Sequence, residues 1–210
     1  MKCLIIAGGE LREDFRAVLT ETAAAADMVI CADRGYGYAK ELGIVPDVLL
    51  GDFDSYTGEL PEGIELHRSV PEKDDTDTML AVKLAISRGA DEITLCCALG
   101  GRFDHTMANV QTLVYALENG CRMTIADSCN VITVQGAERR EYLRREGEYF
   151  SVFAYTPASD IRELSGVKYP LRAHTLTASF PLGVSNEITE ERAVLDVASG
   201  TVVVVRSAAG

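Results

Sequence analysis

The chain has 210 residues, 47% of them hydrophobic, which allows one large domain or two small ones with a buried core. Its formal net charge is −12 and no run is rich in Lys and Arg, which argues against a nucleic-acid partner. No apolar run reaches the length of a membrane span, so we expect no membrane partner either.

The first part of the chain alternates between two hydrophobic patterns. Short apolar runs predict strands over residues 4–7, 28–32, 48–50, 66–70, 93–98 and 123–126. Apolar residues at helical spacing predict helices over residues 11–26, 36–42, 76–88 and 103–119. Asp74 or Asp75 is expected to cap the third of these helices. Strands that alternate with helices predict an α/β domain with a mostly parallel, doubly wound sheet.

The helical period disappears after about residue 130. Strand-like runs follow over residues 131–134, 149–155, 175–180, 192–197 and 201–205, and turn-forming residues separate them. The run from Glu138 to Arg145 mixes acids with bases and is interpreted as a solvated face. We therefore expect an α/β domain over residues 1–130 and an all-β, sandwich-like domain over residues 131–210.

The six cysteines lie at positions 3, 31, 96, 97, 121 and 129, and none forms a Cys-x-x-Cys pair. This spacing argues against zinc, and five of the six lie in or beside apolar runs, where a thiol behaves as a small hydrophobe. The first residues carry an apolar run too short for a signal peptide. We expect reduced thiols and a cytoplasmic protein.

Acidic loops follow several of the predicted strands. Asp52 and Asp54 come directly after the strand at 48–50, and two carboxylates at this spacing can hold one Mg²⁺. Ordinary turn chemistry also explains Asp and Gly at such a place. However, the carboxyl ends of parallel strands share one edge of a sheet, so the acidic loops are expected to meet there.

The segment from Lys73 to Asp77 places three carboxylates and a cation at a helix start. Asp77 can join the metal site, and Lys73 can face a phosphate or the substrate. Acids are also common at helix starts for dipole reasons alone. Asp74, Asp75 and Asp77 all stay open as candidates for a general base.

Two further loops carry residues suited to a nucleotide. Gly100 and Gly101 let the backbone approach a phosphate at a helix start, and Arg102 can hold phosphate oxygens in a fork. Asp104 can orient ribose, a base or Arg102, or simply cap the helix, and the role of His105 stays open. In the loop at 33–35, Asp33 can contact nucleotide and Gly35 suits a tight turn; Gly8 and Gly9 also end a strand. Neither the dinucleotide nor the P-loop fingerprint is present.

In order along the chain, the segments 33–35, 51–55, 73–77, 100–105, 166–171 and 183–187 resemble the thiamine pyrophosphokinase family. The resemblance covers nearly the whole chain. It implies Mg²⁺-dependent transfer of a pyrophosphoryl group from ATP to the thiamine hydroxyl, giving AMP and thiamine diphosphate. The family often has Asp-Gly-Gly where this chain has Asp33-Arg34-Gly35, which leaves the role of Arg34 open.

The resemblance also distributes roles over the motif residues. The metal ligands are Asp52, Asp54 and Asp77, and the catalytic set adds Lys73 and Asp74. The ATP side comprises Asp33, Gly35, Gly100, Gly101, Arg102 and Asp104. The thiamine side comprises Lys73, Asp77, Tyr169, Ser185 and Asn186. A homodimer is implied, in which residues 1–130 carry the nucleotide and metal, and residues 131–210 carry thiamine and the dimer contact, with thiamine shared between subunits.

Two other interpretations compete with this one. A different Mg²⁺-dependent Asp-x-Asp transferase or a phosphatase would use the same carboxylates but leave the motifs at 73–77 and 100–105 unexplained. A non-catalytic module that senses nucleotide or thiamine would not need the full set of Asp52, Asp54 and Asp77.

Overall fold

The structure is a computed structural model and describes residues 1–51, 63–68 and 75–208. The predicted site residues Asp52, Asp54, Lys73 and Asp74 lie outside the described residues. The chain divides into two compact units, Met1–Ser128 and Cys129–Gly210, called the first and second unit below. No helix in the described ranges is long and apolar enough to cross a membrane.

The first unit contains a parallel sheet. Its described strands are β1 (Lys2–Ile6), β2 (Met28–Ala32), β3 (Val48–Gly51), β4 (Glu65–Arg68), β5 (Glu92–Cys96) and β6 (Arg122–Ala126). They lie in the order β4-β3-β2-β1-β5-β6, and each neighbouring pair is parallel. The chain builds outward from β1 to β4 and then returns to place β5 on the other side of β1. The order therefore switches direction between β1 and β5, where ligands bind in folds of this type.

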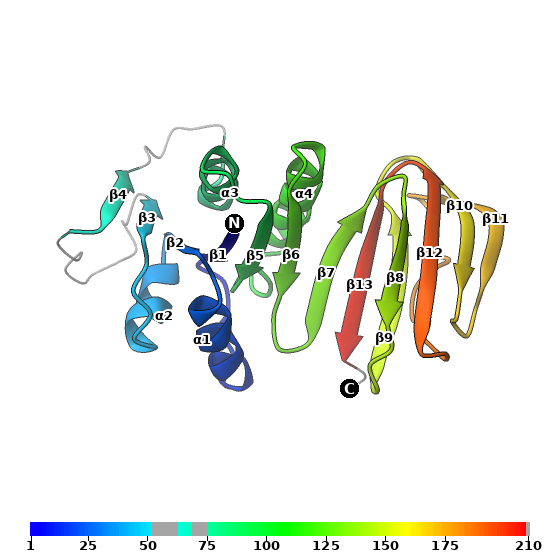
Figure 1. Cartoon of the computed structure of the whole chain (residues 1–210), viewed down its shortest axis with the longest axis horizontal. Helices are drawn as coiled ribbons and strands as arrows, with labels where there is room; N and C mark the ends of the chain where they lie inside the picture. Colours follow the sequence, from blue (N-terminus) through cyan, green and yellow to red (C-terminus); the bar gives the residue numbers. More distant parts are fainter. Residues whose placement is uncertain (52–62, 69–74, 209–210) are drawn as a thin grey trace. The chain divides into compact units, whose positions relative to one another are not determined.

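Helices cover both faces of this sheet (Figure 1). They are the 3-10 turn η1 (Glu13–Phe15) and the helices α1 (Arg16–Ala24), α2 (Gly35–Glu41), α3 (Asp77–Ser87) and α4 (Phe103–Glu118). Leu19 of α1 and Tyr36 of α2 pack in one cluster with Leu4, Ile6 and Val29 of the strands. On the other face α3 contacts β1, β2 and β3, and α4 contacts β6. The predicted doubly wound parallel sheet is confirmed.

The start of α3 differs from the expectation. Thr76 is the N-cap, in extended conformation (φ −70°, ψ 156°), and its hydroxyl accepts the backbone N–H of Met79 at 3.1 Å. Asp75 instead accepts a hydrogen bond from Lys83 at 2.6 Å, so the prediction of Asp75 as cap is wrong. The reason is geometric: Thr76 stands three residues before Met79, where a cap side chain reaches the helix.

The second unit consists of antiparallel strands in two sheets. The strands are β7 (Asn130–Gln135), β8 (Arg139–Leu143), β9 (Glu148–Ala154), β10 (Ala158–Ser165), β11 (Leu171–Thr177), β12 (Arg192–Ser199) and β13 (Val202–Ala208). Within the unit, β13 pairs with β7 and β9, while the other sheet has the order β11-β10-β12-β8. Phe150, Ile161, Leu195 and Val204 are among the buried residues that share one core. The predicted sandwich-like β domain is confirmed.

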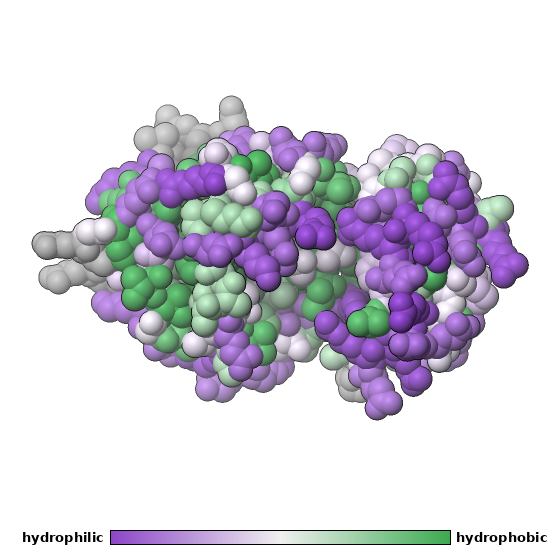
Figure 2. Space-filling model, in the orientation of Figure 1, coloured by the Kyte–Doolittle hydropathy of each residue, from purple (hydrophilic) through white to green (hydrophobic). Residues whose placement is uncertain are grey.

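The sequence patterns missed β8 and β10. The segment interpreted as a solvated face contains β8, whose exposed Arg139 and Glu141 alternate with half-buried neighbours. Tyr142 packs its ring against Phe150, with ring centroids 5.0 Å apart. β8 has few apolar side chains, so its sequence does not show the alternation of apolar and polar residues by which the other strands were predicted. The side of the second unit shown in Figure 2 is accordingly mostly hydrophilic.

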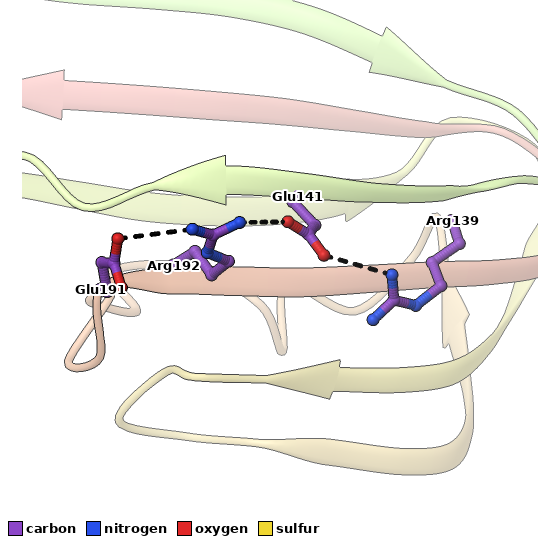
Figure 3. Close-up of polar contacts among 4 residues, drawn as sticks. All are labelled: Arg139, Glu141, Glu191 and Arg192. Atoms are coloured by element: carbon purple, nitrogen blue, oxygen red, sulfur yellow. Dashed lines mark hydrogen bonds and ion pairs between the residues drawn. The ribbon is translucent and has the colours of Figure 1, made fainter.

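A chain of ion pairs connects β8 with β12 and the residue before it (Figure 3). Glu141 accepts from Arg192 at 2.8 Å and from Arg139 at 3.3 Å, and Glu191 lies 3.3 Å from Arg192. Hydrogen bonding from Arg192, the largest cause, lowers the pKa of Glu141. These side chains are solvated, so each pair adds little to stability.

Candidate functional site

A cleft of about 480 Å³ lies in the first unit at the carboxyl ends of β1, β2 and β5. It therefore occupies the place where the strand order switches direction. Of the sequence-predicted site residues, Asp33, Asp77, Gly100, Gly101 and Arg102 line this cleft. They come from three separate loops, as the shared edge of a parallel sheet predicts.

Gly8 and Gly9 form one wall of the cleft, and neighbours hold this turn in place. Gly9 donates its N–H to the carbonyl of Cys97 at 2.7 Å, and a Cβ on Gly9 would lie 2.4 Å from that oxygen. Arg34 donates to the carbonyl of Gly8 at 2.8 Å, and the Tyr38 hydroxyl donates to that of Gly9 at 2.7 Å. Both carbonyls are thus engaged from α2 and the residue before it, which shapes this wall.

The loop after β2 has an unusual backbone at Asp33 and close packing at Gly35. Asp33 is half-buried and has a left-handed backbone, with φ 52°, which is uncommon outside glycine. At Gly35, a Cβ would lie 2.0 Å from the carbonyl oxygen of Ile6, so α2 begins in backbone contact with the end of β1. Strained backbone of this kind is frequent at functional sites.

Arg102 and Asp104 form a forked ion pair at the start of α4. The Nε and Nη2 atoms of Arg102 donate to the two carboxylate oxygens of Asp104 at 3.1 and 2.5 Å. This hydrogen bonding is the main cause that lowers the pKa of Asp104. Asp104 also accepts the N–H of His105 at 3.0 Å, while the N-cap position belongs to Arg102. The carboxylate thus orients the guanidinium that lines the cleft.

Asn109 and Tyr38 line the cleft as well, and the sequence patterns did not identify them. Asn109 of α4 is 6% exposed and donates to the carbonyl of Ala98 at 2.7 Å, which ties the β5 loop to the helix. The available signal was a polar Asn four residues after His105, within the apolar pattern of α4. Tyr38 offered no comparable signal, because it lies in an unremarkable helical segment.

The described part of the chain contributes one predicted metal ligand to the cleft, Asp77, the first residue of α3. Among the described residues, no group of three acidic, His or Cys side chains is placed to hold a metal ion. The other two predicted ligands, Asp52 and Asp54, lie outside the described ranges. The predicted donor set consists of carboxylates alone, and such oxygens suit a hard divalent cation.

The predicted thiamine residues Tyr169, Ser185 and Asn186 gather in the second unit. Asn186 is buried and hydrogen-bonds to the backbone N–H and carbonyl of Tyr169. Ser185 is exposed, has φ 56°, and donates its N–H to the hydroxyl of Ser151 at 3.0 Å. The Tyr169 side chain is 59% exposed. The structure therefore brings these three residues together in one surface region.

The doubly wound sheet with a cleft at its switch point, followed by a β-sandwich, defines a two-unit α/β and all-β protein whose candidate ligand site lies at the carboxyl edge of the parallel sheet. The family model described as "Thiamin pyrophosphokinase, catalytic domain" matches residues 19–125, and "Thiamin pyrophosphokinase, vitamin B1 binding domain" matches residues 128–202. The chain belongs to the thiamine pyrophosphokinase family.

Individual relatives support this membership. A thiamine pyrophosphokinase of Bacillus subtilis is 33% identical over 186 residues, which cover 85% of this chain and 86% of the relative. A solved structure of thiamine pyrophosphokinase from Bacillus subtilis superposes with a TM-score of 0.87 at 26% identity, covering 99% of both chains. The structure of a family protein from Enterococcus faecalis gives a TM-score of 0.84 at 28% identity, again covering 99% of both chains.

The chain is therefore an enzyme that transfers a pyrophosphoryl group from ATP to thiamine and makes thiamine diphosphate. As a kinase of this family it binds thiamine and a nucleotide and uses a divalent metal. The family membership decides among the three interpretations of the sequence in favour of the pyrophosphokinase.

Proposed function

We propose that the cleft of the first unit binds ATP together with Mg²⁺, and that Tyr169, Ser185 and Asn186 of the second unit form the thiamine site. One observation carries the ATP assignment. The residues that the sequence predicted for nucleotide binding come from loops far apart in the chain. They line a single cleft at the switch point of a parallel sheet.

On the ATP side, we assign the phosphates to Arg102 and to the backbone of Gly100 and Gly101. Both glycines have left-handed backbone, with φ 80° and 62°, so the chain turns sharply just before α4. Asp104 holds the Arg102 guanidinium in a fixed plane, which suits bidentate contact with phosphate oxygens. Asp33 supplies a carboxylate from the β2 loop for the nucleotide, and Gly35 brings the start of α2 against the end of β1.

We propose Mg²⁺ as the divalent metal and Asp77, Asp52 and Asp54 as its ligands. When bound, the metal neutralises charge on the phosphates and stabilises the charge that develops during transfer. Lys73 is assigned to a position near thiamine, where its positive charge can neutralise negative charge on the phosphoryl groups during transfer. Asp75 accepts a hydrogen bond from Lys83 at 2.6 Å, and Asp74, Asp75 and Asp77 all stay candidates for receiving the proton of the thiamine hydroxyl.

On the thiamine side, the exposed Tyr169 ring can stack on the substrate or offer its face to the thiazolium cation. Lys168 already lies 5.7 Å from the centre of that ring and pairs with Glu187 at 2.7 Å. The Tyr169 face is thus compatible with positive charge. Ser185 is exposed and directly precedes Asn186, which is hydrogen-bonded to the backbone of Tyr169.

A coupled assay tests the proposed reaction. Formation of AMP from ATP is measured by ³¹P NMR with and without thiamine. AMP and thiamine diphosphate are expected in equal amounts, and only when thiamine is present. ATP breakdown that is independent of thiamine, or that gives ADP, would contradict the proposal.

Arg102→Ala tests the placement of ATP. Loss of a charged hydrogen-bonding partner is expected to cost about 1.5–3 kcal/mol of ATP binding or transition-state stabilisation. KM for ATP, kcat or both should worsen. A variant impaired only in thiamine affinity would show that Arg102 belongs to the other subsite.

We further propose a homodimer with a thiamine site shared between subunits. The support is the family resemblance, because one chain already contains both the unit with the ATP residues and the unit with the thiamine residues. Asp52→Asn is mixed with the double variant Ser185→Ala, Asn186→Ala under conditions of subunit exchange. Each mixed dimer would have one intact composite site, so activity should recover to about one quarter of wild type. Verified mixed dimers without recovery would eliminate the shared site.

We also propose a cytoplasmic location. Support comes from the six reduced cysteines, five of which are buried without a disulfide. Cell fractionation tests this, and recovery of the protein from an oxidising compartment would contradict it.

A further inference from the structure

Arg34 is a cation of the cleft that the family motif leaves without a role. Its side chain is exposed and lines the cleft beside Gly8. The Nη2 atom donates to the carbonyl of Gly8 at 2.8 Å, which fixes the position of the guanidinium. A single bond to a neutral oxygen uses only part of the five N–H donors of an arginine.

The two arginines of the cleft differ in their partners. Arg102 is paired with Asp104 through both carboxylate oxygens. Within the described part of the chain, Arg34 forms no ion pair, and its hydrogen bond leaves its positive charge uncompensated by a carboxylate. Of the two, Arg34 therefore offers the less neutralised charge to a ligand.

The position of Arg34 follows from the order of the strands. β1 lies between β2 and β5, so the loop after β2, with Arg34, and the loop after β5, with Arg102, flank the Gly8–Gly9 turn that ends β1. A ligand lying over that turn would meet one guanidinium from each side.

The charge of the lining also favours this arrangement. The described lining includes the carboxylates of Glu10, Asp33 and Asp77 and the guanidiniums of Arg34 and Arg102. A polyphosphate entering such a cleft needs cations placed at its oxygens, since carboxylates repel it. A guanidinium fork matches phosphate oxygens geometrically.

We propose that Arg34 is a second polyphosphate-binding residue, which holds a nucleoside triphosphate from the β2 side while Arg102 holds it from the β5 side. This inference rests on the proposed binding of ATP in the cleft. It assigns to Arg34 a contact with the phosphates and not with the nucleoside.

The test compares charged and neutral ligands on the full-length protein. Binding of ATP is measured by calorimetry without thiamine, and binding of adenosine by ligand-observed NMR. Arg34→Met is expected to weaken ATP binding about tenfold and to change adenosine binding less than about twofold, because only ATP carries phosphates. Arg34→Lys should recover part of the loss, and raised salt should shrink the difference between wild type and Arg34→Met.

Lys40→Met is the matched control, because it removes the same charge from an exposed position of α2 outside the cleft lining. It should leave ATP binding unchanged, and an equal loss there would reduce the effect of Arg34 to net charge. Equal weakening of ATP and adenosine in Arg34→Met would overturn the inference in favour of a role in bracing Gly8.

The inference and the proposed ATP site fail in different ways. If Arg102→Ala weakens ATP binding and Arg34→Met does not, the cleft keeps its assignment and Arg34 is not a ligand. If both variants bind ATP as wild type does, the proposed ATP site itself is wrong.

Discussion

Asn186 and Tyr169 hold each other through a reciprocal pair of hydrogen bonds. Oδ1 of Asn186 accepts the N–H of Tyr169 at 3.0 Å, and Nδ2 donates to the carbonyl of Tyr169 at 2.9 Å. The same Oδ1 accepts the N–H of Glu187 at 2.9 Å, and the side chain is 3% exposed. The amide is thus largely committed to backbone, so Asn186 is suited to fixing the segment that presents the Tyr169 ring.

The first prediction follows from this pair. Asn186→Ala should lower the free energy of unfolding by about 1–3 kcal/mol, because it leaves backbone groups of Tyr169 without partners. It should also weaken thiamine binding, and in a Tyr169→Ala background that second effect should nearly vanish. Thermal unfolding and the KM for thiamine, measured over the double-mutant cycle, check both parts. Additive losses of thiamine affinity would mean that Asn186 contacts thiamine independently of Tyr169.

The second prediction concerns the metal. Asp77→Asn should lower kcat by about 10²-fold or more at saturating Mg²⁺, since a neutral amide binds the cation weakly and stabilises less charge. Asp14→Asn removes an exposed carboxylate that does not line the cleft and serves as the control. Turnover is measured as AMP release, before and after exhaustive chelation. Full activity in Asp77→Asn, or after chelation, would remove the metal or this ligand from the site.

The third prediction uses two glycines of the same helix. Gly35→Ala should destabilise the protein by about 1–3 kcal/mol, because its Cβ would lie 2.0 Å from the carbonyl oxygen of Ile6. At Gly37 a Cβ meets no atom within 4 Å, so Gly37→Ala should be neutral or stabilise by up to about 1 kcal/mol. Chemical denaturation measures both. Equal stability of the two variants would show that α2 moves away from β1 without cost.

The fourth prediction concerns the buried thiols. Burial raises the pKa of Cys3, Cys31 and Cys97 from 9.0 to about 12. Above pH 9 the unfolded chain releases these protons while the folded chain retains them, so the stabilisation is complete below pH 9 and is lost as the pH rises toward 12. The free energy of unfolding, followed against pH, should fall over this range.

The rate at which a thiol reagent labels each cysteine provides the control for that prediction. A control is needed because other groups also titrate at alkaline pH and affect the free energy of unfolding. At about pH 8 a thiol reagent should label Cys129 first, since it alone of the six is partly exposed. Cys129→Ser should remove the fast phase. Rapid labelling of the other five in the native protein would contradict their burial.

The spacing of apolar residues along the sequence was sufficient to predict the architecture of both units. Buried strands appear as short apolar runs, and helices as apolar residues at helical spacing. This spacing failed at β8, where Arg139 and Glu141 face solvent, and at β10, where polar residues separate Ile161 from Leu164. In both strands, only the cross-strand partners reveal which residues face inward.

The site divides in the same way. Of the residues that line the cleft, Asp33, Asp77 and Arg102 were predicted as site residues because charged residues directly after apolar strands, or at helix starts, stand out in a sequence. Tyr38 and Asn109 were not, because their contribution is a hydrogen bond to the carbonyl of Gly9 or Ala98 elsewhere in the chain. Such contacts depend on the packing of α2 and α4 against the sheet, which local sequence does not encode.

The ion pairs around Glu141 bear on how the molecule behaves at high concentration. β8 lies at one end of its sheet order, and an end strand presents backbone groups that can pair with another molecule. Arg139, Glu141 and Arg192 bring charges of both signs to that edge. A foreign strand docking there would have to displace or desolvate these charges, so we expect the pattern to disfavour edge-to-edge aggregation.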